Sequence, residues 1–204
     1  MRKYLFKILT LSGVLLLSFS TDGGNGWKLR KSEDGIRVYT RISQGSNILE
    51  YKAVASFDCQ PSELKNELDN PKGYTKWMYN LKAARLLEKT DSNNIYAYYL
   101  TSVPWPFNDR DIVVLQKTKI RNDSTILIEI SSHPDRYPEQ KGIFRIKKAH
   151  GYWLLKRKSY GKTGVTYSFF SDPGGNLPVW LVNSFIVDSP YESLKSLKQK
   201  INQK

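Results

Sequence analysis

The chain has 204 residues, of which 40% are hydrophobic and 13% aromatic, so it is long and apolar enough for one folded domain and is not a largely disordered protein. Its formal net charge of +13 predicts attraction to anionic surfaces, whether nucleic acid, acidic lipid headgroups or an acidic polymer. Its single cysteine, Cys59, excludes a disulfide within the chain and a thiol-rich metal cluster.

The first twenty residues have the layout of a secretory signal peptide. Three basic residues precede an apolar run over residues 8–19, and residues 18–20 offer a small-x-small cleavage site. A membrane-spanning helix needs roughly 20 apolar residues, so an uncleaved anchor is the less favoured alternative. We therefore expect residues 1–20 to be a signal peptide cleaved near Ser20, residues 21–26 to be a linker, and the protein to be exported, either to the periplasm or as a secreted protein.

The chain after the linker predicts an antiparallel meander interrupted by a short helix. Residues 36–41 and 47–57 alternate between apolar and polar side chains and predict a hairpin. Leu64 and Leu68 lie four apart after a proline, so residues 61–70 predict a helix. Further along the chain we expect a helical or turn segment over residues 71–80 and then strands over residues 83–90, 95–103, 111–120, 124–131, 143–149, 152–159 and 163–170. Consecutive strands with short turns, several of them containing glycine, favour antiparallel pairing.

The last element, residues 177–203, predicts a long amphipathic helix. Its apolar residues fall mostly at helical spacing and lysines take the other face, while Pro190 should kink or weaken its middle. Residues 172–175 read Asp-Pro-Gly-Gly and predict a tight reversal, after which Asn176 can cap the helix with Pro178 in its first turn. A helix of this length that follows a curved sheet can bury its apolar face across the mouth of that sheet.

Three motifs, in order along the chain, resemble those of START domains, the StAR-related lipid-transfer fold. They are "YTKWMYN" at residues 74–80, "PWPFNDRDIVV" at residues 104–114 and "DPGGNLPVWLVN" at residues 172–183. The resemblance covers roughly residues 27–203. It implies an α+β helix-grip fold, in which a strongly curved antiparallel sheet wraps a long C-terminal helix and a tunnel between them holds one lipid or sterol. Residues 27–204 are therefore expected to form a START-like lipid-binding domain.

Strand alternation selects the side chains that could line such a tunnel. On the strand over residues 111–120, Gln116 shares a face with two apolar residues, whereas Lys117 and Lys119 share the other face and prefer water. The two faces of the strand over residues 95–103 are left unassigned. The complete set of predicted ligand-binding residues is Tyr98, Ile112, Val114, Gln116, Ile126, Ile128, Val182, Phe185 and Ile186. The alternative for each of these residues is simple packing in a solid core.

The polar content of the predicted tunnel bears on the ligand. Some sterol-binding members of the family place a buried acid–base pair in the cavity, at positions similar to Ala97 and Gln116 of this chain. Neither residue is charged, which argues against the same polar anchor and puts sterol specificity in doubt. Gln116 can still hydrogen-bond a hydroxyl or an ester of a ligand.

The residues that usually carry catalysis are sparse and poorly placed. His133 and His150 are the only histidines, and neither has a partner at a spacing typical of a metal site or a catalytic triad. Asp109 and Asp111 flank Arg110, and we expect them to form ion pairs that fix the turn rather than a pair of catalytic carboxylates. The sequence therefore predicts no catalytic residue, no metal and no cofactor.

Together these features favour a monomeric, non-enzymatic carrier or sensor that binds one lipid or other hydrophobic molecule and makes transient contact with anionic membrane. Two alternatives stay open. Similar helix-grip proteins include polyketide cyclases and aromatases that use the tunnel as a reaction chamber. A surface module that binds anionic polymers through charge alone is the other alternative. Residues 144–162 mix basic and aromatic side chains, but an exported protein rarely meets nucleic acid, so no nucleic acid is expected as a partner.

Overall fold

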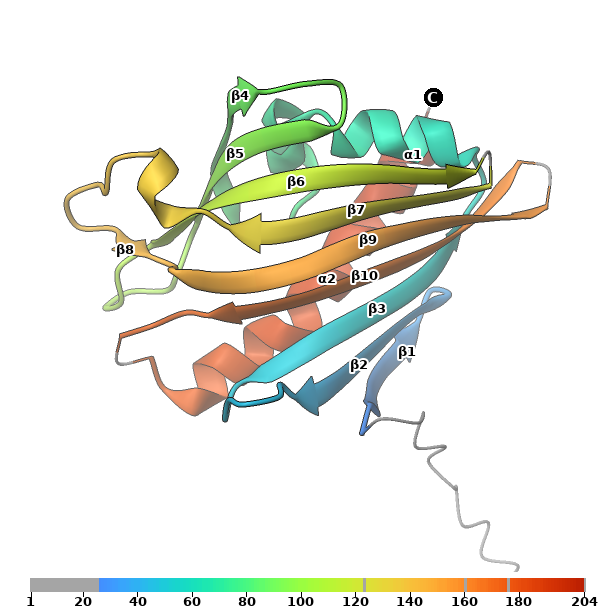
Figure 1. The fold of residues 1–204 in the computed structure, drawn as a ribbon. Helices are drawn as coiled ribbons and strands as arrows, with labels where there is room; N and C mark the ends of the chain where they lie inside the picture. Colours follow the sequence, from blue (N-terminus) through green and yellow to red (C-terminus); the bar gives the residue numbers. More distant parts are fainter. Residues whose placement is uncertain (1–25, 123, 160, 176, 204) are drawn as a thin grey trace, which may run out of the picture.

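The computed structural model describes residues 26–122, 124–159, 161–175 and 177–203. The predicted signal peptide and all of the predicted linker except Gly26 lie outside the described residues. The described chain forms one curved sheet that wraps around a long C-terminal helix, as Figure 1 shows. The α+β helix-grip fold that the sequence predicts is therefore confirmed.

Ten strands of the described chain form the sheet, and nine of them follow one antiparallel path. Their order across the sheet is β1-β2-β3-β10-β9-β7-β6-β5-β4, and β8 adds a short parallel pairing to β6. The strands are β1 (Lys28–Glu33), β2 (Ile36–Ile42), β3 (Leu49–Phe57), β4 (Leu81–Lys89), β5 (Asn94–Thr101), β6 (Arg110–Asn122), β7 (Thr125–Ser132), β8 (Phe144–Arg145), β9 (Lys148–Ser159) and β10 (Lys162–Asp172). The helices are α1 (Pro61–Leu68) and α2 (Val179–Asn202), with the short 3-10 helices η1 (Pro71–Lys76) and η2 (Pro134–Arg136).

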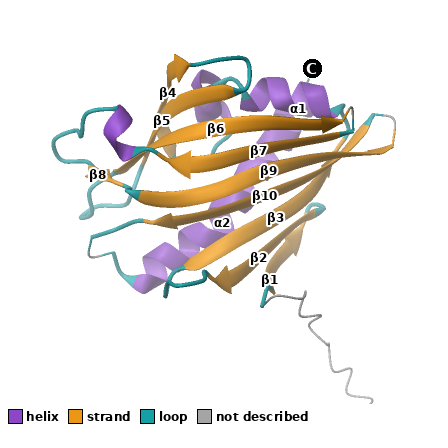
Figure 2. Cartoon of the chain, in the orientation of Figure 1, coloured by secondary structure: helices purple, strands orange, loops and turns teal. Residues whose placement is uncertain are grey.

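The N-terminal hairpin and the last strand meet within the sheet. β3 pairs antiparallel with β10, so that Ala53 lies opposite Tyr167 and Ala55 lies opposite Val165. α1 and η1 connect β3 to β4, and α1 contacts β7 and β9. α2 contacts β1, β2 and β3. Figure 2 shows the result, with α2 lying across the inside of the curved sheet.

The hydrophobic core lies between the sheet and the C-terminal half of α2. Leu194 and Leu197 are fully buried and belong to the same cluster as Ile36 and Val38, which point inward from β2. Successive side chains of a strand point to opposite faces, so Ile36 and Val38 of β2 and the alternate residues 51, 53, 55 and 57 of β3 reach this core, whereas Ile42 at the end of β2 is exposed. Among the described residues, we find no helix whose length and hydropathy would allow it to cross a membrane.

One continuous strand, β9, replaces two strands that the sequence predicts on either side of Gly151. Gly151 pairs with Phe169 of β10 and Ile130 of β7 inside this strand. A Cβ atom at position 151 would lie 2.3 Å from the backbone oxygen of Ser168, so a larger residue would push β10 away. This glycine therefore permits close approach of a neighbouring strand rather than a turn. The predicted strand over residues 143–149 is divided between the two residues of β8 and the first two residues of β9. β1 was not predicted from the sequence.

The predicted reversal before the last helix is confirmed. Gly174 and Gly175 have φ values of 57° and 65°, which favour glycine, and the backbone N–H of Gly174 donates to Oδ1 of Asp172 at 3.0 Å. Pro178 occupies the cap position that was expected of Asn176, which lies outside the described residues. α2 continues as one helix through Pro190, although Pro190 has no N–H to donate to the carbonyl of Ile186.

Candidate ligand-binding site between the sheet and the last helix

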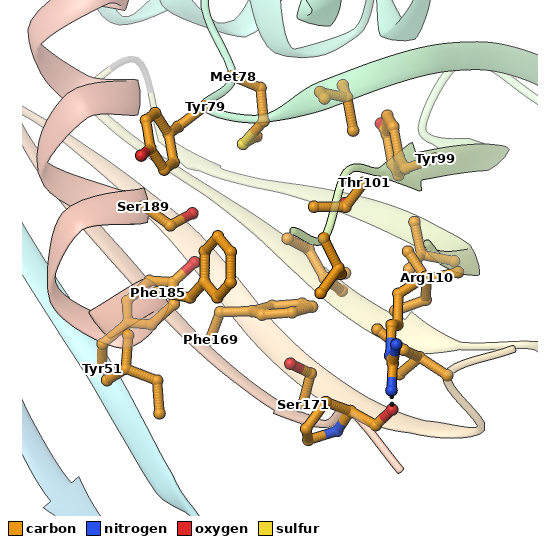
Figure 3. A pocket seen from close by; sticks show the side chains of 18 of the residues that line it. Tyr51, Met78, Tyr79, Tyr99, Thr101, Arg110, Phe169, Ser171, Phe185 and Ser189 are labelled. Carbon is orange, nitrogen blue, oxygen red and sulfur yellow. Dashed lines mark hydrogen bonds between the residues drawn. The ribbon is translucent and has the colours of Figure 1, made fainter. Parts of the chain in front are cut away.

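A pocket with a volume of about 220 Å³ lies between the sheet and the N-terminal half of α2. Its walls come from β3, β5, β6, β7, β9 and β10, from the segment between η1 and β4, and from α2. Figure 3 shows that the side chains lining it are mostly aromatic or aliphatic, among them Phe169 of β10 and Phe185 of α2. Such an apolar cavity with a few polar groups is the usual form of a binding site for a small hydrophobic molecule.

Six of the nine predicted ligand-binding residues line this pocket. They are Ile112, Val114 and Gln116 of β6 and Val182, Phe185 and Ile186 of α2. Lys117 and Lys119, on the opposite face of β6, are exposed. The inward face of this strand was predicted from that alternation. Contact between these six residues and a ligand stays a prediction.

Tyr98 does not line the pocket, and Tyr99 does. Tyr98 lies on the outer face of β5, where its ring is 4.9 Å from that of Tyr137, and burial together with the Asp111 carboxylate raises the pKa of its hydroxyl to about 12. The segment that contains η2 covers this outer face, so both faces of β5 are buried. The residue of β5 that lines the pocket at this point is thus Tyr99, one position along from the predicted Tyr98.

Ile126 and Ile128 also lie outside the pocket. Both are buried on the inward face of β7, but they pair with Ile120 and Thr118 in the second half of β6. The pocket lies over the first half of β6, and Ile130 is the residue of β7 that lines it. Ile126 and Ile128 therefore pack in the hydrophobic core, which was the alternative to lining a tunnel.

Three polar side chains form a hydrogen-bonded group on the pocket wall. Nε2 of Gln116 donates to the hydroxyl oxygens of Tyr74 and Tyr99, at 3.2 Å in each case, and the hydroxyl of Tyr74 donates to the backbone oxygen of Leu68 at 2.8 Å. Burial raises the pKa of both tyrosine hydroxyls, so they stay neutral near pH 7. We call these three residues the polar floor. Tyr74 is not among the predicted site residues, although it is the first residue of the "YTKWMYN" motif.

A stack of aromatic rings forms another wall of the pocket. The rings of Trp153 and Tyr167 are parallel with centroids 3.8 Å apart, and the ring of Tyr51 meets Tyr167 edge-on at 5.3 Å. These rings come from β9, β10 and β3, the strands that pair near the middle of the sheet. Aromatic rings have few rotatable bonds, so this wall is rigid and apolar.

Arg110 is the one charged side chain among the described residues that line the pocket. It is 6% exposed, and its guanidinium donates to the backbone oxygens of Asn108, Pro173 and Gly174. It thereby holds the turn before α2 against the start of β6. Figure 3 shows it below Tyr99 and beside Ser171, away from the α2 side of the pocket.

The ion pairs expected for the two aspartates beside Arg110 are present. Asp109 contacts Nζ of Lys82 at 2.7 Å, and Asp111 contacts Arg145 through two hydrogen bonds of 2.7 and 3.0 Å. Both histidines lie elsewhere, with His133 against Tyr96 and His150 against Phe170. Over the described ranges, we find no cluster of three side chains suited to a metal ion.

The family model of the START domain matches residues 16–203 of this chain. The chain belongs to the START domain family. This START domain is 36% identical over 172 residues to an uncharacterised protein of Pseudomonas aeruginosa, covering 84% of this chain and 85% of that protein. It is 31% identical over 171 residues to the phosphatidylcholine transfer protein of Rattus norvegicus, covering 78% of this chain and 76% of that protein.

Solved structures agree with the sequence relatives. The STAR-related lipid transfer protein of Xanthomonas axonopodis superposes with a TM-score of 0.80 at 31% identity, covering 87% of this START domain and 99% of that chain. The names of the relatives from Rattus norvegicus and Xanthomonas axonopodis both state lipid transfer. The pocket described above lies between the same two parts of the fold, the sheet and the last helix, that the family resemblance implied.

Proposed function

We propose that this START domain binds a single lipid or other hydrophobic molecule in the pocket between the sheet and α2. The observation that carries the proposal is the pocket itself, which is apolar over most of its wall and has one polar floor. An empty apolar cavity of this size costs on the order of 5 kcal/mol of stability, a large part of the net stability of a domain. A bound acyl chain offsets that cost, because each buried methylene contributes about 0.8 kcal/mol.

The proposed role is carriage or sensing without chemical change of the ligand. The described residues that line the pocket include no histidine, carboxylate or cysteine. The hydroxyls of Tyr74 and Tyr99 have raised pKa values, so near pH 7 they stay protonated and release a proton poorly, and Arg110 is held by backbone oxygens. A cyclase or aromatase would need a positioned acid or base in the pocket. Turnover of an aromatic polyketide precursor by the purified protein would favour that alternative.

Native mass spectrometry of the purified protein tests the proposal. We expect a monomer that carries one bound lipid per chain, and solvent extraction followed by mass spectrometry should identify the lipid. Protein that emerges empty and takes up no lipid from vesicles would contradict the proposal. Salt-sensitive binding to a polyanion such as heparin, with no bound lipid, would instead support the surface module driven by charge.

Entry of the ligand is proposed to occur through the N-terminal half of α2. The C-terminal half is held firmly, because the hydroxyl of Tyr191 donates to Asp34 at 2.7 Å and Lys195 lies 2.8 Å from the same carboxylate. Pro190 separates the two halves and leaves the carbonyl of Ile186 without its usual partner in the helix. The half of α2 that lines the pocket is therefore the half more easily displaced.

Two exposed tryptophans support transient contact with an anionic membrane near the start of α2. Trp105 is 91% exposed in the loop before β6, and Trp180 is 69% exposed in the first turn of α2. These two segments lie at the same end of the molecule in Figure 1. Two exposed lysines lie at that end as well, because Lys148 is the first residue of β9 and Lys147 precedes it. Tryptophan favours the boundary between headgroups and acyl chains, and lysine favours anionic lipid.

Trp105→Ala and Trp180→Ala should each weaken binding to vesicles of phosphatidylglycerol and phosphatidylcholine by roughly tenfold, from the apolar area no longer buried. Vesicle co-sedimentation measures this. The matched control is Ile120→Ala, because Ile120 is also a large exposed apolar residue but lies at the opposite end of β6. Equal weakening by Ile120→Ala, or no weakening by either tryptophan variant, would count against this membrane contact.

Export is proposed on the sequence of residues 1–20 alone. The same layout of basic residues, apolar run and small residues supports it. Fractionation of cells that express the full chain, with N-terminal sequencing of the product, tests both export and cleavage near Ser20.

A further inference from the structure

One buried acceptor in the pocket has no hydrogen-bond partner among the described residues. It is Oε1 of Gln116, whose side chain lines the pocket and is 3% exposed. Leaving a buried carbonyl oxygen unpaired costs about 1–3 kcal/mol, so native proteins rarely do so without a reason. A partner from outside the chain would remove this cost.

The orientation of the Gln116 amide follows from its neighbours. The hydroxyl of Tyr74 has a single proton, and that proton is donated to the backbone oxygen of Leu68 at 2.8 Å. The group of Gln116 that faces Tyr74 must therefore be the donor, its NH₂. A flipped amide would place Oε1 against a hydroxyl oxygen that has no proton left to give. In the orientation in which Nε2 bonds both hydroxyls, Oε1 has no partner among the described residues.

The other groups of the polar floor are engaged with one another. The hydroxyl oxygens of Tyr74 and Tyr99 both accept from the NH₂ of Gln116, and the phenolic proton of Tyr74 goes to Leu68. The two rings are stacked with centroids 5.2 Å apart, which fixes both hydroxyls beside the Gln116 amide. The buried acceptor that this arrangement leaves without a partner is Oε1 of Gln116, and its missing partner is a hydrogen-bond donor.

The surroundings restrict that donor to an uncharged group. No carboxylate lies among the described lining residues, so a buried ammonium group would have no counter-ion there. Burying an unpaired charge is far more costly than burying a hydroxyl or an amide N–H. Phosphatidylcholine, which the name of one relative specifies, fails on a separate ground. Its ester and phosphate oxygens only accept hydrogen bonds, and its quaternary ammonium carries no N–H.

We propose that the ligand of this START domain is a neutral lipid that presents a free hydroxyl or amide N–H to Oε1 of Gln116, and is not phosphatidylcholine. This rests on the proposed function, and it adds the chemical class of the ligand. Gln116 acts as the specificity-determining residue, because it distinguishes a hydrogen-bond donor from an acceptor at the buried end of the ligand. The remaining apolar lining holds the hydrocarbon part.

A pair of probes that differ in a single donor tests the inference. 1-Dodecanol and its methyl ether have nearly the same apolar area, but the ether cannot donate. We expect the wild-type protein to bind the alcohol about tenfold to a hundredfold more tightly than the ether, since the ether leaves Oε1 unpaired. Titration followed by intrinsic tryptophan fluorescence measures both affinities, because Trp153 lines the pocket.

The variant Gln116→Met keeps the length of the side chain and removes both polar atoms. It should bind alcohol and ether with affinities within about twofold of each other, since the hydrogen bond that separates them is gone. The matched control, Val114→Ala, changes the same face of β6 and should weaken both probes while keeping the preference for the alcohol. Circular dichroism establishes that each variant is folded. If Gln116→Met does not fold, the relative affinities of the wild-type protein for the two probes test the inference.

The outcomes separate this inference from the proposed function. If neither probe binds, lipid binding in this pocket is overturned and the inference falls with it. If both probes bind the wild type equally, the pocket binds apolar molecules but Oε1 is satisfied by water, and the inference alone is overturned. Phosphatidylcholine as the lipid that co-purifies would also overturn it, whereas a hydroxyl- or amide-bearing neutral lipid would support it.

Discussion

Val182→Arg is expected to abolish lipid uptake while leaving the protein folded. Val182 lines the pocket from the N-terminal half of α2, the part of the helix proposed to move when ligand enters. An arginine there would either fill the pocket with its own side chain or place a guanidinium in an apolar wall without a carboxylate partner. Either outcome competes directly with the ligand, and we expect affinity to fall by roughly a hundredfold or more.

The measurement is transfer of a fluorescent lipid from donor vesicles, together with the bound fraction seen by native mass spectrometry. Asn183→Arg is the matched control, because Asn183 is the next residue of α2 and is exposed. It adds the same charge to the same helix and should leave uptake unchanged. A folded Val182→Arg protein that takes up lipid as the wild type does would show that this stretch of α2 does not close the pocket.

The elements that the sequence predicts well are those whose burial is one-sided. β2, β3 and the second half of β6 each have one face toward the core and the other more exposed, so the alternation of side chains marks both the strand and its inward face. The lysines of β6 indicated the inward position of Gln116 for this reason. α2 was predicted on the same principle, because its apolar residues recur with the period of a helix instead of at every second position.

The failures occur where the deciding neighbour is distant in sequence. Both faces of β5 are buried, because the segment around η2 covers the outer one, so alternation does not distinguish Tyr98 from Tyr99. Gly151 resembles a turn residue locally, and only the close backbone of Ser168 in β10 explains it. The polar floor is a further case, since Tyr74 reaches Gln116 from η1, 42 residues earlier in the chain.

Arg145→Met should destabilise the protein by about 3–5 kcal/mol, because it leaves the carboxylate of Asp111 buried without a cation. The side chains of Arg145 and Asp111 are each 1% exposed, and the carboxylate raises the pKa of Arg145. Arg145 also donates to the backbone oxygens of Pro134, Tyr137 and Pro138, so it ties the segment around η2 to the start of β6. Its loss removes both the counter-ion and this attachment. Urea unfolding followed by circular dichroism measures the change in the free energy of unfolding.

The cause of that loss can be isolated with two further proteins. Lys119→Met removes the cation of an exposed pair, because Lys119 and Glu129 are each nearly half exposed and lie 2.7 Å apart. It should cost less than about 1 kcal/mol, since water solvates the remaining carboxylate. Combining Arg145→Met with Asp111→Asn removes the unpaired charge and should recover part of the loss, because a neutral amide is cheaper to bury than a carboxylate. If the double variant is no more stable than Arg145→Met, the bonds to the three backbone oxygens account for the effect and the buried charge does not.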